Sequence, residues 1–230
     1  MVKGIAYGIG VGPGDPELMT LKAVRLIRTC GVIAVPGKVA EESVAYRIAA
    51  AAVPELNEKK LLAIYMPMTR VREQMDAEHR RGARMLETHL DRGEDVVFLT
   101  LGDPTIYSTF SYLQRILEAD GYPVEIVPGI PSFCAAAARL NTPLAEWDEP
   151  LHVLPAVHRI ENTLNQPGTY VLMKSASHIT EVKELLQRSG RDTFAVENCG
   201  METEAIYRSV EEIPDDAGYY TLIVAKEHRG

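Results

Sequence analysis

The amino-acid sequence predicts an α/β fold with two domains, an N-terminal domain built on a mostly parallel sheet with helices and a C-terminal domain built on a mixed sheet. Between residues 5 and 138, short apolar segments alternate with amphipathic segments of helical period. Residues 96–101 form an uninterrupted apolar run, which is typical of a strand buried in a parallel sheet. After residue 150 the strand-like segments follow one another with fewer helices between them, which favours a mixed sheet.

The N-terminal domain is expected to alternate strands with helices. The expected strands are residues 5–11, 32–35, 61–65, 96–101 and 124–127. A first helix is expected directly after Asp15, which is a candidate N-cap, with Pro16 at the first helical position. The further expected helices are residues 43–53, 71–90, 106–119 and 132–138.

The loop 141–150 carries two prolines, acidic residues and the only tryptophan, and we place the domain boundary there. The expected domains are therefore residues 1–143 and 144–230. Beyond the boundary, the expected strands are residues 151–154, 170–173, 193–196, 205–210 and 219–225.

The composition is that of a globular protein. With 46% hydrophobic and 24% charged residues, the chain of 230 residues can bury an apolar core in one large or two small domains. The 24 basic residues against 32 acidic ones give a net charge of −8, which argues against nucleic acid as the main partner. A few arginines and lysines can still converge locally on an anionic substrate.

The cysteines and the N-terminus bear on the cellular compartment. The three cysteines lie far apart without a CxxC spacing, which favours a reducing compartment and no metal cluster. The N-terminus shows no basic and apolar leader, and no apolar run approaches the length of a membrane span. We therefore expect a cytoplasmic protein without a membrane partner.

Two turns at strand ends carry the candidate chemistry. The first is rich in glycine at alternate positions, residues 8, 10, 12 and 14, so it does not fit the GxGxxG dinucleotide fingerprint. No Walker A sequence occurs in the chain. The second turn is Gly102-Asp103-Pro104, in which Gly102 permits close backbone approach and Asp103 can accept hydrogen bonds. Taken alone, each turn also fits a simple structural turn.

The wider context of these turns resembles the tetrapyrrole methylase family. The resemblance rests on GVGPGDPELMTLKA at residues 10–23 and FLTLGDPTIYS at residues 98–108. Residues 127–133 and 196–200 fit the third and fourth motifs of the family, so the resemblance covers nearly the whole chain. Residues 65–70, 109–112, 135–141 and 143–145 resemble the branch that methylates carbon 20 of precorrin-2 or cobalt-factor II.

The resemblance implies a homodimeric two-domain enzyme of cobalamin biosynthesis that methylates a tetrapyrrole carbon. S-adenosylmethionine is expected between the domains, and the glycine-rich turn is expected to face the macrocycle. The implied cofactor contacts are Val11, Pro13, Gly102, Asp103, Ile106, Tyr107, Ser132, Phe133, Met173, Lys174, Cys199, Thr221 and Leu222. Residues 171–175 lack the glycine that many relatives have there, so the register of the second-domain contacts is open by one residue.

The methyl transfer that the resemblance implies needs few catalytic groups from the protein. The sulfonium is a strong electrophile and the reduced bridge carbon is enamine-like, so proximity and alignment are expected to supply most of the acceleration. We expect neither an essential protein nucleophile nor a catalytic metal. Asp103 is expected to contact the cofactor rather than to act as a base, and Tyr107 to form a wall or a donor near the reacting centre.

The polycarboxylate substrate is expected to need basic partners. Arg70 is the first candidate, and Asp15 is expected at the substrate. Lys38, Arg47 and Arg72 come behind Arg70, because each of them taken singly fits a solvated surface charge better than a substrate contact. The six histidines show neither an HxH nor an HExxH pattern and are expected to be surface or hydrogen-bonded histidines rather than metal ligands or bases.

Three other functions stay open at this stage. The first is a sibling enzyme that methylates another ring carbon, and the second is a non-catalytic module that only binds the cofactor. The third, a dinucleotide oxidoreductase, is disfavoured by the broken fingerprint. The sequence does not distinguish metal-free from cobalt-loaded substrate.

Overall fold

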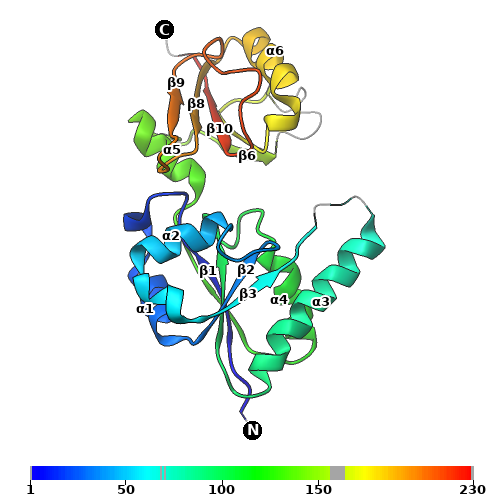
Figure 1. Ribbon diagram of the computed structural model, residues 1–230. Helices are drawn as coiled ribbons and strands as arrows, with labels where there is room; N and C mark the ends of the chain where they lie inside the picture. The colour runs from blue at the N-terminus through cyan, green and yellow to red at the C-terminus, as the bar shows by residue number, and fades with distance from the viewer. Residues whose placement is uncertain (1, 68, 70, 156–163, 229–230) are drawn as a thin grey trace. The chain divides into compact units, whose positions relative to one another are not determined.

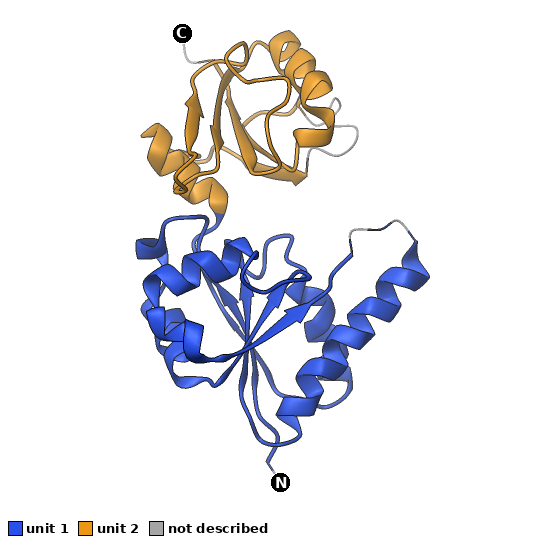
Figure 2. Cartoon of the chain, viewed as in Figure 1, with its two compact units in different colours: residues 1–131 blue, residues 132–230 orange. Residues whose placement is uncertain are grey.

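A computed structural model describes residues 2–67, 69, 71–155 and 164–228. The chain divides into two compact units, Met1–Pro131 and Ser132–Gly230 (Figure 2). The break lies before the boundary expected after residue 143. Among the described residues, no helix combines the length and apolar character that a membrane span needs.

The first unit is a parallel sheet between two layers of helices (Figure 1). The strand order is β3-β2-β4-β1-β5, and every pairing is parallel, as predicted. The strands are β1 (Ala6–Gly10), β2 (Val32–Pro36), β3 (Lys60–Ile64), β4 (Val96–Thr100) and β5 (Val124–Val127). The helices are α1 (Leu21–Thr29), α2 (Val44–Ala52), α3 (Arg72–Leu90) and α4 (Phe110–Ala119), with 3-10 turns η1 (Pro16–Leu18) and η2 (Pro54–Glu58).

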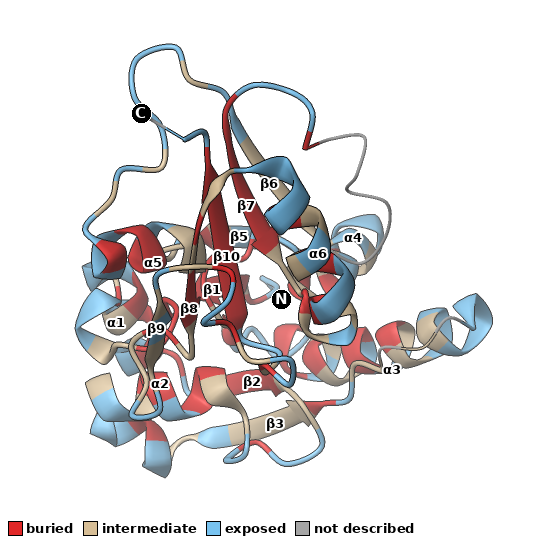
Figure 3. Ribbon diagram, turned by 90° about the horizontal axis from the view of Figure 1, so that it is seen from above, coloured by how far each residue is buried: buried red, intermediate tan, exposed pale blue. Residues whose placement is uncertain are grey.

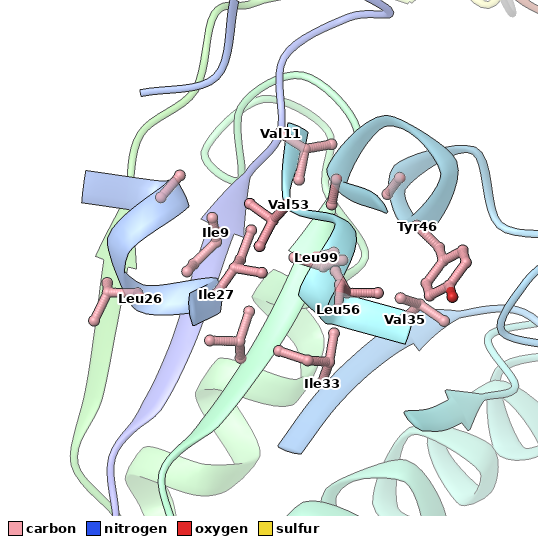
Figure 4. Close-up of a cluster of buried hydrophobic side chains, with 14 of the residues drawn as sticks. Ile9, Val11, Leu26, Ile27, Ile33, Val35, Tyr46, Val53, Leu56 and Leu99 are labelled. Atoms are coloured by element: carbon pink, nitrogen blue, oxygen red, sulfur yellow. The ribbon is translucent and has the colours of Figure 1, made fainter. Parts of the chain in front are cut away.

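The alternation of side chains along the strands builds one core on each face of this sheet. One core joins the strands to α1, α2 and η2, and Ile9, Ile27 and Leu99 are among its members (Figure 4). The opposite core joins the strands to α3 and α4 and includes Phe98 and Phe110. Because successive side chains of a strand point to opposite faces, burial on both faces explains the continuous apolar runs of β2 and β4.

Two helices begin later than the sequence predicts. Asp15 caps a short 3-10 turn, since its Oδ1 accepts the Glu17 N–H at 2.9 Å. The α-helix then starts at Leu21, after an N-cap at Thr20. The helix expected from residue 106 begins at Phe110, because residues 102–109 form the turn that follows β4.

The second unit contains a mixed sheet of order β6-β7-β10-β8-β9, which confirms the predicted mixed architecture. Only β6 and β7 pair in parallel, and the other three pairings are antiparallel. The strands are β6 (Leu151–Pro155), β7 (Thr169–Met173), β8 (Asp192–Glu197), β9 (Ala205–Tyr207) and β10 (Thr221–Lys226). The helices are α5 (Ser132–Leu140) and α6 (Ile179–Ser189), with a 3-10 turn η3 (Ala176–His178). In Figure 3 the outer surface of α6 is pale blue, whereas β10 is red over its length.

This unit also differs from expectation in three elements. Helix α6 was not expected, although it buries Ile179, Val182 and Leu186 at helical spacing. Strand β9 ends at Tyr207 rather than at residue 210. Strand β10 starts at Thr221 rather than at residue 219, because the Thr221 N–H turns back to the carbonyl of Gly218.

Helix α5 belongs to the second unit because its contacts lie there. It packs against β8 and β10, and Arg139 Nε donates to Glu204 at 3.0 Å. The buried Lys226 of β10 donates to the carbonyl oxygens of Pro143 and Leu144, which fixes the loop after the helix. The compact units therefore separate before α5, whereas loop composition had suggested a separation after it.

Gly8 is needed for packing rather than for backbone freedom. A Cβ built at Gly8 would lie 2.1 Å from the Phe110 ring, which packs against Phe98, the register neighbour of Gly8. We expect Gly8→Ala to lower the free energy of unfolding by about 1–3 kcal/mol in urea denaturation, because overpacking forces the ring to move. Gly31→Ala, where a Cβ meets open space, is the matched control and should change stability little. Equal effects of the two substitutions would contradict this account.

The buried His79 makes stability depend on pH. Its ring stacks on Tyr112 at 4.5 Å, joining α3 to α4. Burial lowers the pKa of His79 from its ordinary 6.5, and Asp76 offsets part of this shift. As the pH falls below about 6.5, His79 is protonated in the unfolded chain before it is protonated in the folded protein. The free energy of unfolding therefore decreases until the pH reaches the lower pKa of the folded state. His79→Gln should remove this loss, at most about 1.4 kcal/mol per pH unit, in urea midpoints compared at pH 7.5 and 5.5. An unchanged pH slope would refute the assignment.

Candidate functional site

The carboxyl edge of the first sheet brings the two candidate turns into direct contact. The backbone N–H of Gly12 donates to the carbonyl of Gly102 at 3.2 Å, and the N–H of Gly102 donates back to Gly12 at 2.8 Å. Both glycines have left-handed backbones, with φ of 78° and 71°. The glycine-rich turn and the Gly-Asp-Pro turn are therefore one structural unit, although 90 positions separate Gly12 from Gly102.

A third turn joins them after β5. A Cβ at Gly10 would lie 2.5 Å from the Gly102 carbonyl oxygen, and one at Gly129 would lie 2.2 Å from the same oxygen. No real side chain tolerates such distances from the backbone, so only glycine fits at either position. The three loops that follow β1, β4 and β5 thus pack backbone against backbone at adjacent strand ends.

Asp103 fixes this arrangement. Its side chain is buried, with 7% of the residue exposed. Oδ1 accepts the Thr105 N–H at 2.8 Å and the Thr105 hydroxyl, and Oδ2 accepts the Gly129 N–H at 2.9 Å. Both carboxylate oxygens therefore bind donors of the first unit, and Asp103 ties the loop after β4 to the loop after β5.

The turn between Asp103 and α4 presents an exposed aromatic side chain. Tyr107 adopts a left-handed backbone with φ of 49° and is 45% exposed. The Ile106 N–H donates to the Asp103 carbonyl, and Ser108 Oγ accepts the Phe110 N–H at 3.1 Å to start the helix. A non-glycine residue at positive φ costs about 1 kcal/mol or more and is typical of functional turns.

One edge of the second sheet collects most of the second-domain candidates. Thr221 at the start of β10 pairs with Glu197 at the end of β8, and Cys199 follows two residues later. The pairing of β10 with β7 ends at Ile223 opposite Leu172, so Leu222 and Met173 are the next residues of these two antiparallel strands toward the same edge.

The backbone at this edge is also strained. Lys174 and Asn198, which directly follow β7 and β8, both have left-handed backbones, with φ of 58° and 50°. Ser132 and Phe133 lie apart from these strand ends in sequence, in the first turn of α5.

Two buried hydroxyls at this edge have no hydrogen-bond partner among the described residues. They are Ser175 Oγ, in a fully buried residue, and Thr221 Oγ1, in a residue that is 2% exposed. Each unsatisfied buried group costs about 1–3 kcal/mol. Such groups suit a polar ligand, so this edge fits a cofactor that offers hydrogen-bonding atoms. The sequence pointed to Thr221 but not to Ser175, whose only signal is a hydroxyl residue two positions after the end of β7.

The expected substrate residues are only partly described. Asp15 uses its Oδ1 as a helix cap, as noted above. Arg70 lies outside the described residues. Lys38 is exposed, and its Nζ lies 5.2 Å from the centre of the Tyr65 ring.

Two buried titratable side chains elsewhere in the first unit have structural surroundings. The buried His89 binds Glu94 through Nδ1. Burial raises the pKa of the Cys30 thiol, and the Asp95 charge adds to the shift. Within the described ranges, no group of three His, Cys, Asp or Glu side chains could hold a metal ion.

Comparison with known proteins agrees with this geometry. Residues 6–214 match the family described as tetrapyrrole (corrin/porphyrin) methylases. The chain belongs to this family. The match includes all three glycine turns of the first unit and the ends of β7 and β8 in the second, and it stops before β10.

Full-length relatives of this methylase come from archaea and bacteria. The chain is 34% identical over 227 residues to a probable cobalt-precorrin-2 C(20)-methyltransferase of Methanocaldococcus jannaschii, covering 97% of this chain and 96% of the relative. It is 30% identical to the cobalt-precorrin-2 C(20)-methyltransferase of Salmonella typhimurium, covering 98% of each. Among solved structures, the uroporphyrin-III C-methyl transferase of Thermus thermophilus in complex with S-adenosyl homocysteine matches with a TM-score of 0.71 at 25% identity, covering 97% of this chain and 98% of that one.

We expect the main role of Asp103 to be structural, because its hydrogen bonds hold the turns together. Asp103→Ala leaves the Gly129 N–H and both Thr105 donors without their partner, so we expect a loss of about 2–3 kcal/mol in the free energy of unfolding. Asp103→Asn keeps an accepting oxygen and should lose less. Urea denaturation measures both, with Glu17→Ala on the exposed turn η1 as a control expected to change little. Wild-type stability of Asp103→Ala would refute the role of Asp103 as a tie between the loops.

Proposed function

We propose that this methylase transfers a methyl group from S-adenosylmethionine to carbon 20 of precorrin-2 or of its cobalt-loaded form, in cobalamin biosynthesis. The observation that carries the proposal is the full-length similarity to C(20)-methyltransferases, at 34% and 30% identity. The fused glycine turns support it, because this similarity includes the segments that build them.

We infer that both units contribute contacts to S-adenosylmethionine. In the first unit the proposed contacts are Val11, Pro13, Gly102, Asp103, Ile106 and Tyr107. In the second unit they are Ser132, Phe133, Met173, Lys174, Cys199, Thr221 and Leu222, to which the orphaned Ser175 hydroxyl is added. The bound cofactor would supply an electrophilic methyl group, and the protein residues would bind and orient the reactants.

The roles of the individual residues follow from their surroundings. Gly102 is buried and its N–H and carbonyl pair with Gly12, so it would act by keeping a side chain out of the turn beside the cofactor. Asp103 acts mainly through these backbones, since its two oxygens already accept three hydrogen bonds. Tyr107, exposed in its strained turn, forms a wall beside the reacting atoms. Asp15 caps the start of η1 through its hydrogen bond from the Glu17 N–H. It belongs to the glycine-rich turn, which we propose to face the macrocycle.

The proposal extends to assembly and place in the cell. We infer a cytoplasmic homodimer, on the family resemblance and the absence of a CxxC pattern in the sequence. The second candidate is a sibling enzyme that methylates another ring carbon, and one observation favours keeping it. The chain is also 29% identical over 197 residues to a precorrin-4 C(11)-methyltransferase of Pseudomonas aeruginosa.

A single-turnover assay decides between these activities. The enzyme is mixed with S-adenosylmethionine carrying a ¹³C methyl group and with either metal-free precorrin-2 or its cobalt form. We expect the label at carbon 20 by NMR, and the faster substrate identifies the natural metal state. Label at another ring carbon would reject the carbon-20 assignment. Calorimetry with S-adenosylhomocysteine and with NADH separates a methylase from a dinucleotide enzyme, since only the first ligand should bind.

The orphaned Thr221 hydroxyl gives a test of the cofactor contacts. Thr221→Val replaces an unsatisfied buried hydroxyl by a methyl group of the same shape, so ligand-free stability should stay equal or rise by up to about 1 kcal/mol. The affinity for S-adenosylhomocysteine, measured by calorimetry, should fall about fivefold or more as one hydrogen bond is lost. Thr193→Val is the matched control, because the Thr193 hydroxyl already donates to the Arg191 carbonyl. That control should lose stability and keep its affinity, and the reverse pattern would count against the assignment.

A further inference from the structure

Two exposed side chains at the carboxyl edge of the first sheet form a pair that the cofactor contacts do not use. Lys38 follows β2 and Tyr65 follows β3, and the Lys38 ammonium lies 5.2 Å from the centre of the Tyr65 ring. Tyr65 is 41% exposed, and Lys38 is exposed as well. A cation over the face of an aromatic ring is attracted by its π electrons, which restricts the motion of the lysine side chain.

The backbone under Lys38 is held in place from two sides. The Gly37 N–H donates to the carbonyl of Ile64 at 2.9 Å, so the loop after β2 lies along the end of β3. Gly37 has a φ of 142°, a conformation that other residues rarely adopt. Ala40 is buried, and its carbonyl accepts the Ser43 N–H at 3.1 Å. The loop therefore presents the Lys38 ammonium at a defined place.

The Lys38 charge has no acidic partner among the described residues. Lys22 of the same unit pairs with Glu125 at 3.6 Å, and Arg28 pairs with Glu55 at 3.7 Å. No comparable ion pair reaches Lys38 from the described parts of the chain, and its ring contact leaves the ammonium donors available. In a protein of net charge −8, such a cation is a local attraction for an anion that the protein as a whole repels.

The position of the pair fits the periphery of a macrocycle. The strand order places the loop after β2 one strand beyond the Gly102 turn, and the loop after β3 one strand further. With strands about 4.8 Å apart, Lys38 and Tyr65 follow strands roughly 5 and 10 Å from β4. A tetrapyrrole with acetate and propionate side chains is wider than two strand spacings, so a macrocycle over the glycine turns extends toward these loops.

We propose that Lys38, held over the Tyr65 ring, binds one peripheral carboxylate of the tetrapyrrole substrate. This inference rests on the proposed function and adds a position that determines substrate affinity. Lysine contacts the carboxylate as a point charge, and the ring reduces the conformational freedom that binding would otherwise remove. The pair touches neither the transferred methyl group nor the reacting carbon.

Kinetics on the intact enzyme test the proposal. Lys38→Gln should raise KM for the tetrapyrrole about fivefold, the value of an ion pair near 1 kcal/mol at an exposed site, with kcat and KM for S-adenosylmethionine unchanged. Lys38→Arg should stay within about twofold of the wild type because it keeps the charge. Tyr65→Phe keeps the ring and should match the wild type, whereas Tyr65→Leu should raise KM about twofold.

Lys60→Gln is the matched control. It removes the same charge from an exposed residue at the start of β3, the opposite end of the sheet, and should leave all constants unchanged. Equal tetrapyrrole KM values for Lys38→Gln and Lys60→Gln would overturn the proposal, as would a Lys38→Gln effect confined to kcat.

A binding measurement separates this proposal from the proposed function. Quenching of uroporphyrin III fluorescence reports binding of a porphyrin polycarboxylate without turnover. We expect weaker binding for Lys38→Gln than for wild type and Lys60→Gln, and a smaller decline of affinity with NaCl concentration. If the wild type binds this porphyrin through Lys38 and yet transfers no methyl group, the proposed function fails and the carboxylate site stands. If methyl transfer proceeds and Lys38→Gln binds like Lys60→Gln, the carboxylate site fails alone.

Discussion

The direct backbone contact among Gly10, Gly102 and Gly129 is the constraint on which the rest of the first site depends. A parallel sheet brings the carboxyl ends of β1, β4 and β5 to one edge, but a Cβ at Gly10 or Gly129 would collide with the Gly102 carbonyl oxygen and push the loops apart. Asp103 then holds two of the loops together through its buried carboxylate. Backbone donors and acceptors fixed in this way need no reorganisation when a ligand arrives, which suits a reaction whose acceleration depends on alignment.

The second unit reaches a comparable edge by other means. The residues that directly follow β7 and β8, Lys174 and Asn198, are left-handed without being glycine, which carries a conformational cost that glycine would avoid. Two hydroxyls remain buried without partners beside them. Backbone strain and missing hydrogen bonds at one sheet edge are the physical marks of a segment shaped for a ligand rather than for stability.

The sequence predicted the architecture well because periodicity and strand burial are local signals. The parallel sheet, the mixed sheet and the role of Asp15 as a cap all follow from residues close together in the chain. The late start of α4 was missed because the backbone of Tyr107 turns left-handed, which no apolar pattern reveals. Contacts between residues far apart in the chain could not be predicted either, because an apolar pattern does not show which distant residues meet. The need for glycine at position 8 comes from Phe110, and the second partner of Asp103 lies 26 residues away.

The candidate site was likewise predictable where it rests on local sequence motifs and not where it rests on three-dimensional contacts. Most of the residues that the motif resemblance named lie at the two sheet edges, with Ser132 and Phe133 in α5 as exceptions, whereas Ser175 became visible only through its buried and unpartnered hydroxyl. Arg70, the first candidate for the substrate carboxylates, lies outside the described residues. What sequence could not supply was the accounting of hydrogen bonds, because each donor and acceptor must be assigned in three dimensions.

The fused turns also limit how this enzyme can be redesigned. Loops at the carboxyl edge of a sheet are usually exchanged one at a time to alter specificity, since each is anchored only by its own strand. Here the Gly102 carbonyl lies against two other loops, so a loop transplanted alone would meet a surface shaped for its predecessor. Grafting from another methylase should therefore move the segments around Gly10, Gly102 and Gly129 as a single block.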